Sequence, residues 1–126
     1  MTHLFEPLTL RGITLPHRIG MPPMCQYSAR DGLANDWHFV HYGCRAIGGA
    51  ALLIVEATAV VPEGRISFGD LGLWNDTQIE PLARIVRFVK EHGTLPAIQL
   101  AHAGRKGSVG LGWQKQGTLM TKLHPG

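Results

Sequence analysis

The run ALLIVEA, residues 51–57, decides the fold class. It is an uninterrupted apolar stretch of strand length that ends near a single carboxylate, which is typical of a parallel strand buried on both faces. Patterns of helical spacing lie on either side of it, over about 36–47 and 76–91, and a second apolar strand, LPAIQLAH (95–102), follows. Strands that alternate with helices in this way predict a parallel α/β sheet with right-handed crossovers.

Turn and capping residues set the limits of the other elements. Alternation around Arg11-Gly12 predicts a hairpin over 4–15, and RIGMPPM (18–24) predicts the first core strand. Asn35 or Asp36 is expected to cap the first helix, and Asn75-Asp76 the second. The recurring apolar positions are Trp37, Val40, Cys44 and Ile47 in the first helix and Ile79, Leu82, Ile85, Val86 and Val89 in the second.

The position of the unusual side chains favours a (β/α)8 barrel over an open sheet. They follow the carboxyl ends of the three strands: Cys25 after the first, Glu56 at the second, and Gln99 on the third. Barrel enzymes assemble their sites at that end. No Gly-rich phosphate motif follows the first strand, which argues against a dinucleotide-binding sheet.

Composition excludes several other classes of protein. The formal charge of +3 comes from 12 basic and 9 acidic residues that are scattered along the chain, so no nucleic-acid surface is expected. The longest apolar run is interrupted by Gly48-Gly49 and Glu56, so no membrane span is expected, and the N-terminus lacks a signal-peptide pattern. Cys25 and Cys44 form no paired motif, which predicts reduced thiols in a cytoplasmic protein.

The stretch GMPPMCQY (20–27) presents a thiol directly after a Pro-Pro kink. Three interpretations of Cys25 are open: a catalytic nucleophile, an inert buried thiol, or a thiol that lies against a flat redox cofactor and tunes its potential. In the third interpretation Pro23 and Met24 supply apolar contact to the ring.

Gln99 is the polar residue of the strand AIQLAH. If Ile98 and Leu100 pack against helices, Gln99 projects into the barrel. A buried amide needs partners for both its donor and its acceptor. An internal hydrogen bond and the pyrimidine edge of a flavin are both able to provide them.

Three other polar side chains have simpler explanations. His38 and His41 share a helix face, but as a metal pair they lack a third ligand, so packing is the alternative and no metal site is expected. Glu56 in a buried strand needs a cation, and Arg18, Arg45 or Arg65 is expected to provide it.

Six blocks of the sequence, in one order, resemble the N-terminal third of the old yellow enzyme family. The similarity is greatest to its bacterial xenobiotic-reductase and NADPH dehydrogenase branch, and it runs from Leu4 to Lys106. The blocks are LFEPLTLRGITLPHRI, PPMCQYSA, NDWHFVHY, IVEATAVVPEGRIS, LGLWND and IQLAHAGRK.

This resemblance implies an FMN-dependent oxidoreductase that takes hydride from NAD(P)H and reduces activated alkenes of the α,β-unsaturated carbonyl type. It implies that the barrel binds FMN non-covalently, that Cys25 tunes the flavin potential, and that Tyr27 contacts the substrate. The residues that the resemblance assigns to the flavin are Pro22, Pro23, Met24, Cys25, Ala57 and Gln99.

The resemblance also predicts how much of the barrel is present. A barrel needs about 250 residues, so residues 1–126 are expected to be the N-terminal part of one flavin-binding domain, with the hairpin, about three βα units and a divergent loop or tail over 107–126. A homo-oligomer is expected for a full-length form. The alternatives are a truncated, inactive remnant that binds no flavin on its own, and a larger flavin barrel with an iron–sulfur domain.

Overall fold

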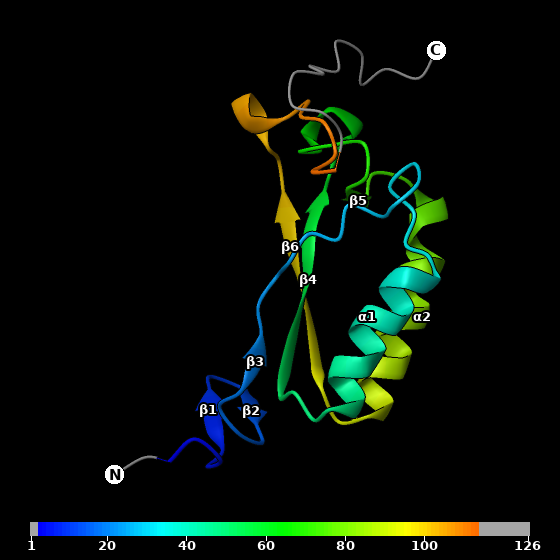
Figure 1. Cartoon of the computed structure of the whole chain (residues 1–126). Helices are drawn as coiled ribbons and strands as arrows, with labels where there is room; N and C mark the ends of the chain where they lie inside the picture. The colour runs from blue at the N-terminus through cyan, green and yellow to red at the C-terminus, as the bar shows by residue number, and fades with distance from the viewer. Residues whose placement is uncertain (1–2, 114–126) are drawn as a thin grey trace.

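The strand β4 (Leu52–Ala59) is the centre of the sheet in the computed structural model, which describes residues 3–113 (Figure 1). β6 (Leu95–Ala101) pairs with one edge of β4 in parallel along its whole length. The other edge pairs with β3 (Gly20–Met21) near the start of β4 and with β5 (Leu71–Gly72) at its end. The parallel pairing of these core strands is the one that the sequence predicted.

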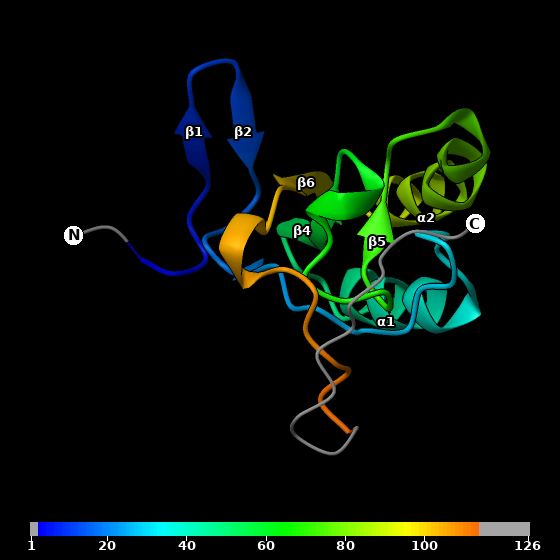
Figure 2. The same cartoon turned by 90° about the horizontal axis from the view of Figure 1, so that it is seen from above.

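Two helices cover one face of this sheet and lie side by side (Figures 1 and 2). They are α1 (Asp36–Ile47), which joins β3 to β4, and α2 (Ile79–Glu91), which joins β4 to β6. Asn35 caps α1 and Asn75 caps the turn η2 (Asp76–Gln78) that leads into α2. Both predicted caps are therefore confirmed. No helix of residues 3–113 has the length and apolarity needed to cross a membrane.

The two ends of the sheet carry different structures. At the end where the strands begin lies the antiparallel hairpin of β1 (Leu8–Leu10) and β2 (Ile13–Leu15), as the sequence predicted (Figure 1). At the opposite end the connecting loops gather, together with the short turns η1 (Pro62–Gly64) and η3 (Gly104–Lys106). Loops at the carboxyl ends of parallel strands are the usual place for a functional site.

The core lies between β4 and the two helices. Its most deeply buried members are Tyr42 of α1, Leu53 of β4, Leu71 of β5 and Val89 of α2. Gly43 allows the helices to approach, because a Cβ at this position would lie 3.1 Å from the ring of Phe88. Leu53 and Val55 are buried, whereas Leu52 and Ile54 are only partly buried, so the first half of β4 is fully buried on one face only.

The prediction of which face of α1 is apolar and packed was wrong. Trp37, Val40 and Ile47 are 60%, 59% and 65% exposed, and Cys44 is also exposed. Both faces of α1 carry apolar residues, so helical spacing alone does not identify the one that faces the core. The residues that α1 buries are His38, His41, Tyr42, Gly43 and Ala46.

Two smaller predictions also need correction. The predicted strand 18–24 is paired only at Gly20–Met21, because Pro22 and Pro23 have no N–H with which to continue the ladder. Ile79, placed in the buried stripe of α2, is 51% exposed, whereas Leu82, Ile85 and Val89 are buried as expected. Of the predicted divergent tail, residues 114–126 lie outside the described part of the chain.

Candidate functional site

A β-bulge in β4 is the centre of the candidate site. Val55 pairs with Ile98 and Thr58 with Leu100, so the two residues between them on β4 face the single residue Gln99 on β6. Those two residues are Glu56 and Ala57. A bulge of this kind redirects side chains and is common beside active sites. Three residues that were named separately from the sequence therefore occupy neighbouring positions of the sheet.

Cys25 lies against this bulge. It is partly buried in the segment 22–29, which follows β3 without regular structure. Burial raises the pKa of the Cys25 thiol, and the negative charges of Asp70 and Glu56 add to this effect, while a hydrogen bond from the backbone of Ala57 acts in the opposite direction. The thiol is therefore protonated at neutral pH. A nucleophilic cysteine needs the reverse environment, so the structure disfavours that interpretation.

Tyr27 adopts an unusual backbone conformation, with a φ of 53°. A non-glycine residue in this region is uncommon, and such residues cluster at functional sites. Gly69 makes room for it, since a Cβ there would lie 2.6 Å from the carbonyl oxygen of Tyr27. Burial raises the pKa of the Tyr27 phenol, and the negative charge of Asp70 adds to this effect. The phenol is thus a hydrogen-bond donor at neutral pH.

The three residues before Cys25 are apolar, and their side chains differ in how far they are exposed to solvent. Pro22 and Met24 are exposed and Pro23 is partly buried. The Met24 carbonyl accepts a hydrogen bond of 2.9 Å from the side-chain amide of Gln26, which fixes the backbone between them. This stretch has the composition of a wall against which an apolar surface packs.

Gln99 has a free amide. Within residues 3–113 its side chain has no hydrogen-bond partner, and it is exposed. Its neighbour Ile98 lines a hollow with residues of α2, including Leu82 and Val86. Alternation along a strand places Gln99 on the face away from Ile98, although Leu100, expected on the same face as Ile98, is 59% exposed. The internal hydrogen bond considered for Gln99 is not present among the described residues.

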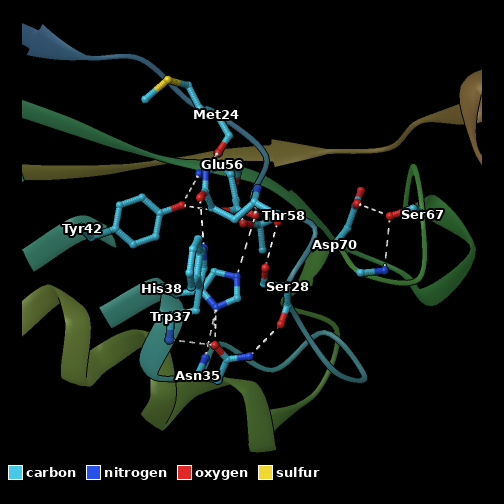
Figure 3. Close-up of polar contacts among 12 residues, drawn as sticks. Met24, Ser28, Asn35, Trp37, His38, Tyr42, Glu56, Thr58, Ser67 and Asp70 are labelled. Carbon is cyan, nitrogen blue, oxygen red and sulfur yellow. Dashed lines mark hydrogen bonds and ion pairs between the residues drawn. The ribbon is translucent and has the colours of Figure 1, made fainter. Parts of the chain in front are cut away.

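Glu56 is fully buried at the bulge, but its partners are not the predicted ones. Its carboxylate accepts hydrogen bonds from the Tyr42 hydroxyl at 2.6 Å and from the Gln26 backbone N–H at 2.9 Å. Figure 3 shows Tyr42 and His38 of α1 both pointing toward it. The expected arginine pairing was wrong: Arg45 and Arg65 instead donate to backbone carbonyls. Burial raises the pKa of Glu56.

His38 and His41 lie on the buried face of α1. Within residues 3–113 no three potential metal ligands come together. His38 Nδ1 accepts a hydrogen bond from the Asn35 backbone N–H at 3.2 Å, so this side chain completes the cap of α1. Burial lowers the pKa of His38 to about 4 and also lowers that of His41. Both rings are neutral at physiological pH, and packing explains their position.

Sequence reasoning missed three residues that support the site. Tyr42 follows His38 by one helical turn, and this spacing would have placed it on the same face. Asp70 is buried and accepts a hydrogen bond from the Ser67 hydroxyl at 2.9 Å (Figure 3). It also accepts one from the Ile66 backbone N–H at 2.8 Å. Burial raises the pKa of Asp70. No sequence pattern singles out the loop residues Ser67 and Asp70.

The chemistry of these groups fits a planar ring with a polar edge. Pro23 and Met24 offer apolar contact, the Cys25 thiol is neutral, and the Gln99 amide offers one donor end and one acceptor end. A flavin has an apolar ring face and a pyrimidine edge with both donors and acceptors. The residues present therefore fit a flavin.

Comparison with known proteins identifies the family. A model of the NADH:flavin oxidoreductase / NADH oxidase family matches residues 3–119. The chain belongs to this family. It is 56% identical over 110 residues to the NADPH dehydrogenase of Geobacillus thermodenitrificans (strain NG80-2), an alignment that covers 86% of this chain and 32% of that relative. The predicted old yellow enzyme family, and an oxidoreductase by family, are confirmed.

Solved structures of this family confirm the fold. Morphinone reductase matches with a TM-score of 0.76 and 35% identity, over 82% of this chain and 27% of the other. Old Yellow Enzyme from Pichia sp. AKU4542 matches with a TM-score of 0.77 and 28% identity, over 83% and 28%. The β3-α1-β4-α2-β6 order is thus part of a (β/α)8 barrel. The chain spans about a third of the length of the curated relatives that it matches.

Proposed function

We propose that the protein that carries this chain binds FMN at the β4 bulge and reduces activated C=C bonds with hydride from NAD(P)H. The single observation that supports this most is that Cys25 and Gln99 both lie beside Ala57 at the bulge. The family supplies the cofactor class, because its description names flavin and NADH and its NADPH dehydrogenase relatives name NADPH.

Each residue has a defined task in this proposal. The Gln99 amide binds the polar edge of the cofactor with its free donor and acceptor. Pro22, Pro23 and Met24 form an apolar wall with the Ala57 backbone beside them. When bound, FMN supplies the redox chemistry, by accepting a hydride from the nicotinamide and passing one to the alkene.

Cys25 and Tyr27 act through their protonated forms. A neutral thiol is a weak hydrogen-bond donor, so Cys25 affects the potential of the cofactor without adding charge. The Tyr27 phenol donates a hydrogen bond to the carbonyl oxygen of the substrate, which withdraws electron density from the alkene. The raised pKa of each group keeps its proton in place at neutral pH.

Flavin binding and turnover test the proposal directly. The purified protein is titrated with FMN and followed by its visible absorbance, and oxidation of NADPH is then measured with 2-cyclohexen-1-one as acceptor. We expect a perturbed flavin spectrum and NADPH oxidation that depends on the enone. A protein that leaves the FMN spectrum unchanged contradicts the proposal and favours the alternative, an inactive remnant. Size-exclusion chromatography of the same sample tests the expected homo-oligomer.

A further inference from the structure

We propose that Glu56 is a positioning residue of the candidate site: from the β4 bulge it holds the backbone amide of Gln26 and so determines where Cys25 and Tyr27 lie. The benefit of this placement to a cofactor or a substrate rests on the proposed function. The placement of Cys25 does not depend on the proposed function, because the reactivity of its thiol can be measured without flavin.

Glu56 is firmly fixed by α1. The Tyr42 hydroxyl donates to Glu56 Oε2 at 2.6 Å and accepts from the Glu56 backbone N–H at 3.0 Å, and all these groups are buried. Tyr42 therefore binds both the side chain and the backbone of Glu56. A charge-assisted hydrogen bond in a buried place is stronger than a neutral one. This double contact anchors the bulge to the helix layer.

Burial raises the pKa of Glu56, whereas the hydrogen bonds from Tyr42 and Gln26 lower it. Its second oxygen, Oε1, accepts from the Gln26 backbone N–H. His38 Nε2 lies 3.9 Å from the same oxygen, which is too far for a hydrogen bond. Among the described residues, the Tyr42 hydroxyl and the Gln26 backbone N–H are thus the two donors to the carboxylate. Asp70 and Cys25 are the other titratable groups near it.

Gln26 connects Glu56 to the residues of the candidate site. In addition to the Glu56 contact, its side-chain oxygen accepts from Trp37 Nε1 at 3.1 Å and its amide donates to the Met24 carbonyl. Its backbone carbonyl accepts from the Ser28 hydroxyl at 2.9 Å. Cys25 and Tyr27 are its two chain neighbours. A residue held at four points therefore sits between the two side chains that line the site.

The backbone of Tyr27 shows that such a restraint is needed. A φ of 53° at a tyrosine is unfavourable in an isolated chain. It persists only if the residues on both sides are held in place. Glu56, held by Tyr42, restrains the residue before Tyr27, which is Gln26. The bulge places the Glu56 carboxylate within hydrogen-bond distance of the Gln26 backbone N–H.

Alkylation of Cys25 tests the proposal without flavin. The variants Glu56→Gln, Tyr42→Phe and the surface control Glu80→Gln are prepared in the protein that carries this chain. Each is treated with iodoacetamide between about pH 6 and about pH 10, and peptide mass spectrometry measures Cys25 and the exposed Cys44 separately. Cys44 serves as an internal control for general unfolding. Glu80 is paired with Arg87 at the surface, so Glu80→Gln makes the same change in charge away from the site.

We expect Glu56→Gln to raise the alkylation rate of Cys25 about threefold or more at about pH 7.5, with its pH profile moved to lower pH. The substitution removes a nearby negative charge and replaces an acceptor oxygen by a donor. Tyr42→Phe keeps the negative charge of Glu56 but removes the hydrogen bonds that hold it. The alkylation rate of Cys25 is therefore expected to rise by about twofold or more, without the same shift of its pH profile. Cys44 reacts as in the parent protein in both variants.

Two results would overturn the proposal. One is a Cys25 rate and profile in Glu56→Gln that match those of Glu80→Gln. The other, which decides the matter if Glu56→Gln does not fold, is an unchanged Cys25 rate in Tyr42→Phe. A flavin titration of the same variants separates this proposal from the proposed function: absent flavin binding in the parent refutes the function alone, whereas the thiol rates still decide the role of Glu56.

Discussion

Gln99 on β6 faces two residues of β4, Glu56 and Ala57, across a bulge that places one extra residue on β4. The extra residue is what allows Glu56 to turn into the core, toward Tyr42, while Gln99 stays on the other face. The same bulge therefore positions the buried Glu56 that supports the site and the Gln99 side chain that is proposed to contact the ligand. Four predictions follow from the contacts around it.

Replacement of Gln99 by Leu is expected to weaken FMN binding. The polar edge of the flavin loses its partner, which costs about 1–3 kcal/mol, or about a 5- to 150-fold rise in Kd. Ile98→Val, one residue away and facing α2, is the control and is expected to leave the Kd unchanged. Fluorescence titration with FMN measures both. Equal affinity in Gln99→Leu and the parent would remove Gln99 from the site.

Replacement of Cys25 by Ala is expected to shift the flavin reduction potential while FMN remains bound. The thiol is neutral and lies beside Ala57, so its loss removes a contact and leaves the nearby charges in place. Cys44→Ala, on the exposed side of α1, is the matched control. Spectroelectrochemistry measures the potential in each. Complete loss of turnover with FMN bound at an unchanged potential would instead support a nucleophilic Cys25.

Tyr42→Phe is expected to destabilise the protein by about 1.5–3 kcal/mol, because a buried carboxylate and a backbone N–H both lose their partner. Tyr27→Phe removes a hydroxyl that is less buried and should cost less than about 1 kcal/mol. Urea denaturation of the two variants gives the comparison. A smaller loss in Tyr42→Phe than in Tyr27→Phe would contradict the anchoring role of Tyr42.

His38 is expected to make stability depend on pH. Its pKa is about 4 in the folded chain and about 6.5 when unfolded, so the unfolded state binds more protons between these values. The contribution of His38 to the free energy of unfolding is therefore fully present above about pH 6.5. It is lost as the pH falls toward 4, by on the order of 2–3 kcal/mol. His41 acts in the same direction, whereas the raised pKa values of Glu56 and Asp70 act in the opposite one.

The variant His38→Gln isolates this contribution. Glutamine at this position keeps the capping contact with Asn35 but does not titrate. Denaturation midpoints at about pH 7 and about pH 4.5 are compared in the parent and the variant. The parent should lose more stability on acidification than the variant. Equal losses would mean that His38 does not titrate in this range.

The sequence predicted the strand and helix order well, because each element has its own local signal. The apolar run of β4 and the caps Asn35 and Asn75 depend on neighbouring residues only. The packed face of α1 was missed because Trp37, Val40 and Ile47 have the same spacing as the truly buried side. The partners of Glu56 were missed for a related reason: they depend on a bulge that no local pattern reveals.

The nearness of Cys25, Ala57 and Gln99 to one another was predictable, but the contacts that support them were not. Cys25 follows β3, and Ala57 and Gln99 lie in the second halves of β4 and β6, and parallel strands bring their carboxyl ends together. Tyr42 and Gln26 are held in relation to Glu56 by tertiary contacts between segments 14 and 30 residues apart. Such contacts become visible only once the helices are placed on the sheet.

The most direct measurement is a crystal structure of the protein that carries this chain, with FMN bound. The expected result is an isoalloxazine ring in contact with Cys25 and Ala57, with the Gln99 amide hydrogen-bonded to its pyrimidine edge. A ring bound elsewhere, with these three residues away from it, would contradict the proposed function.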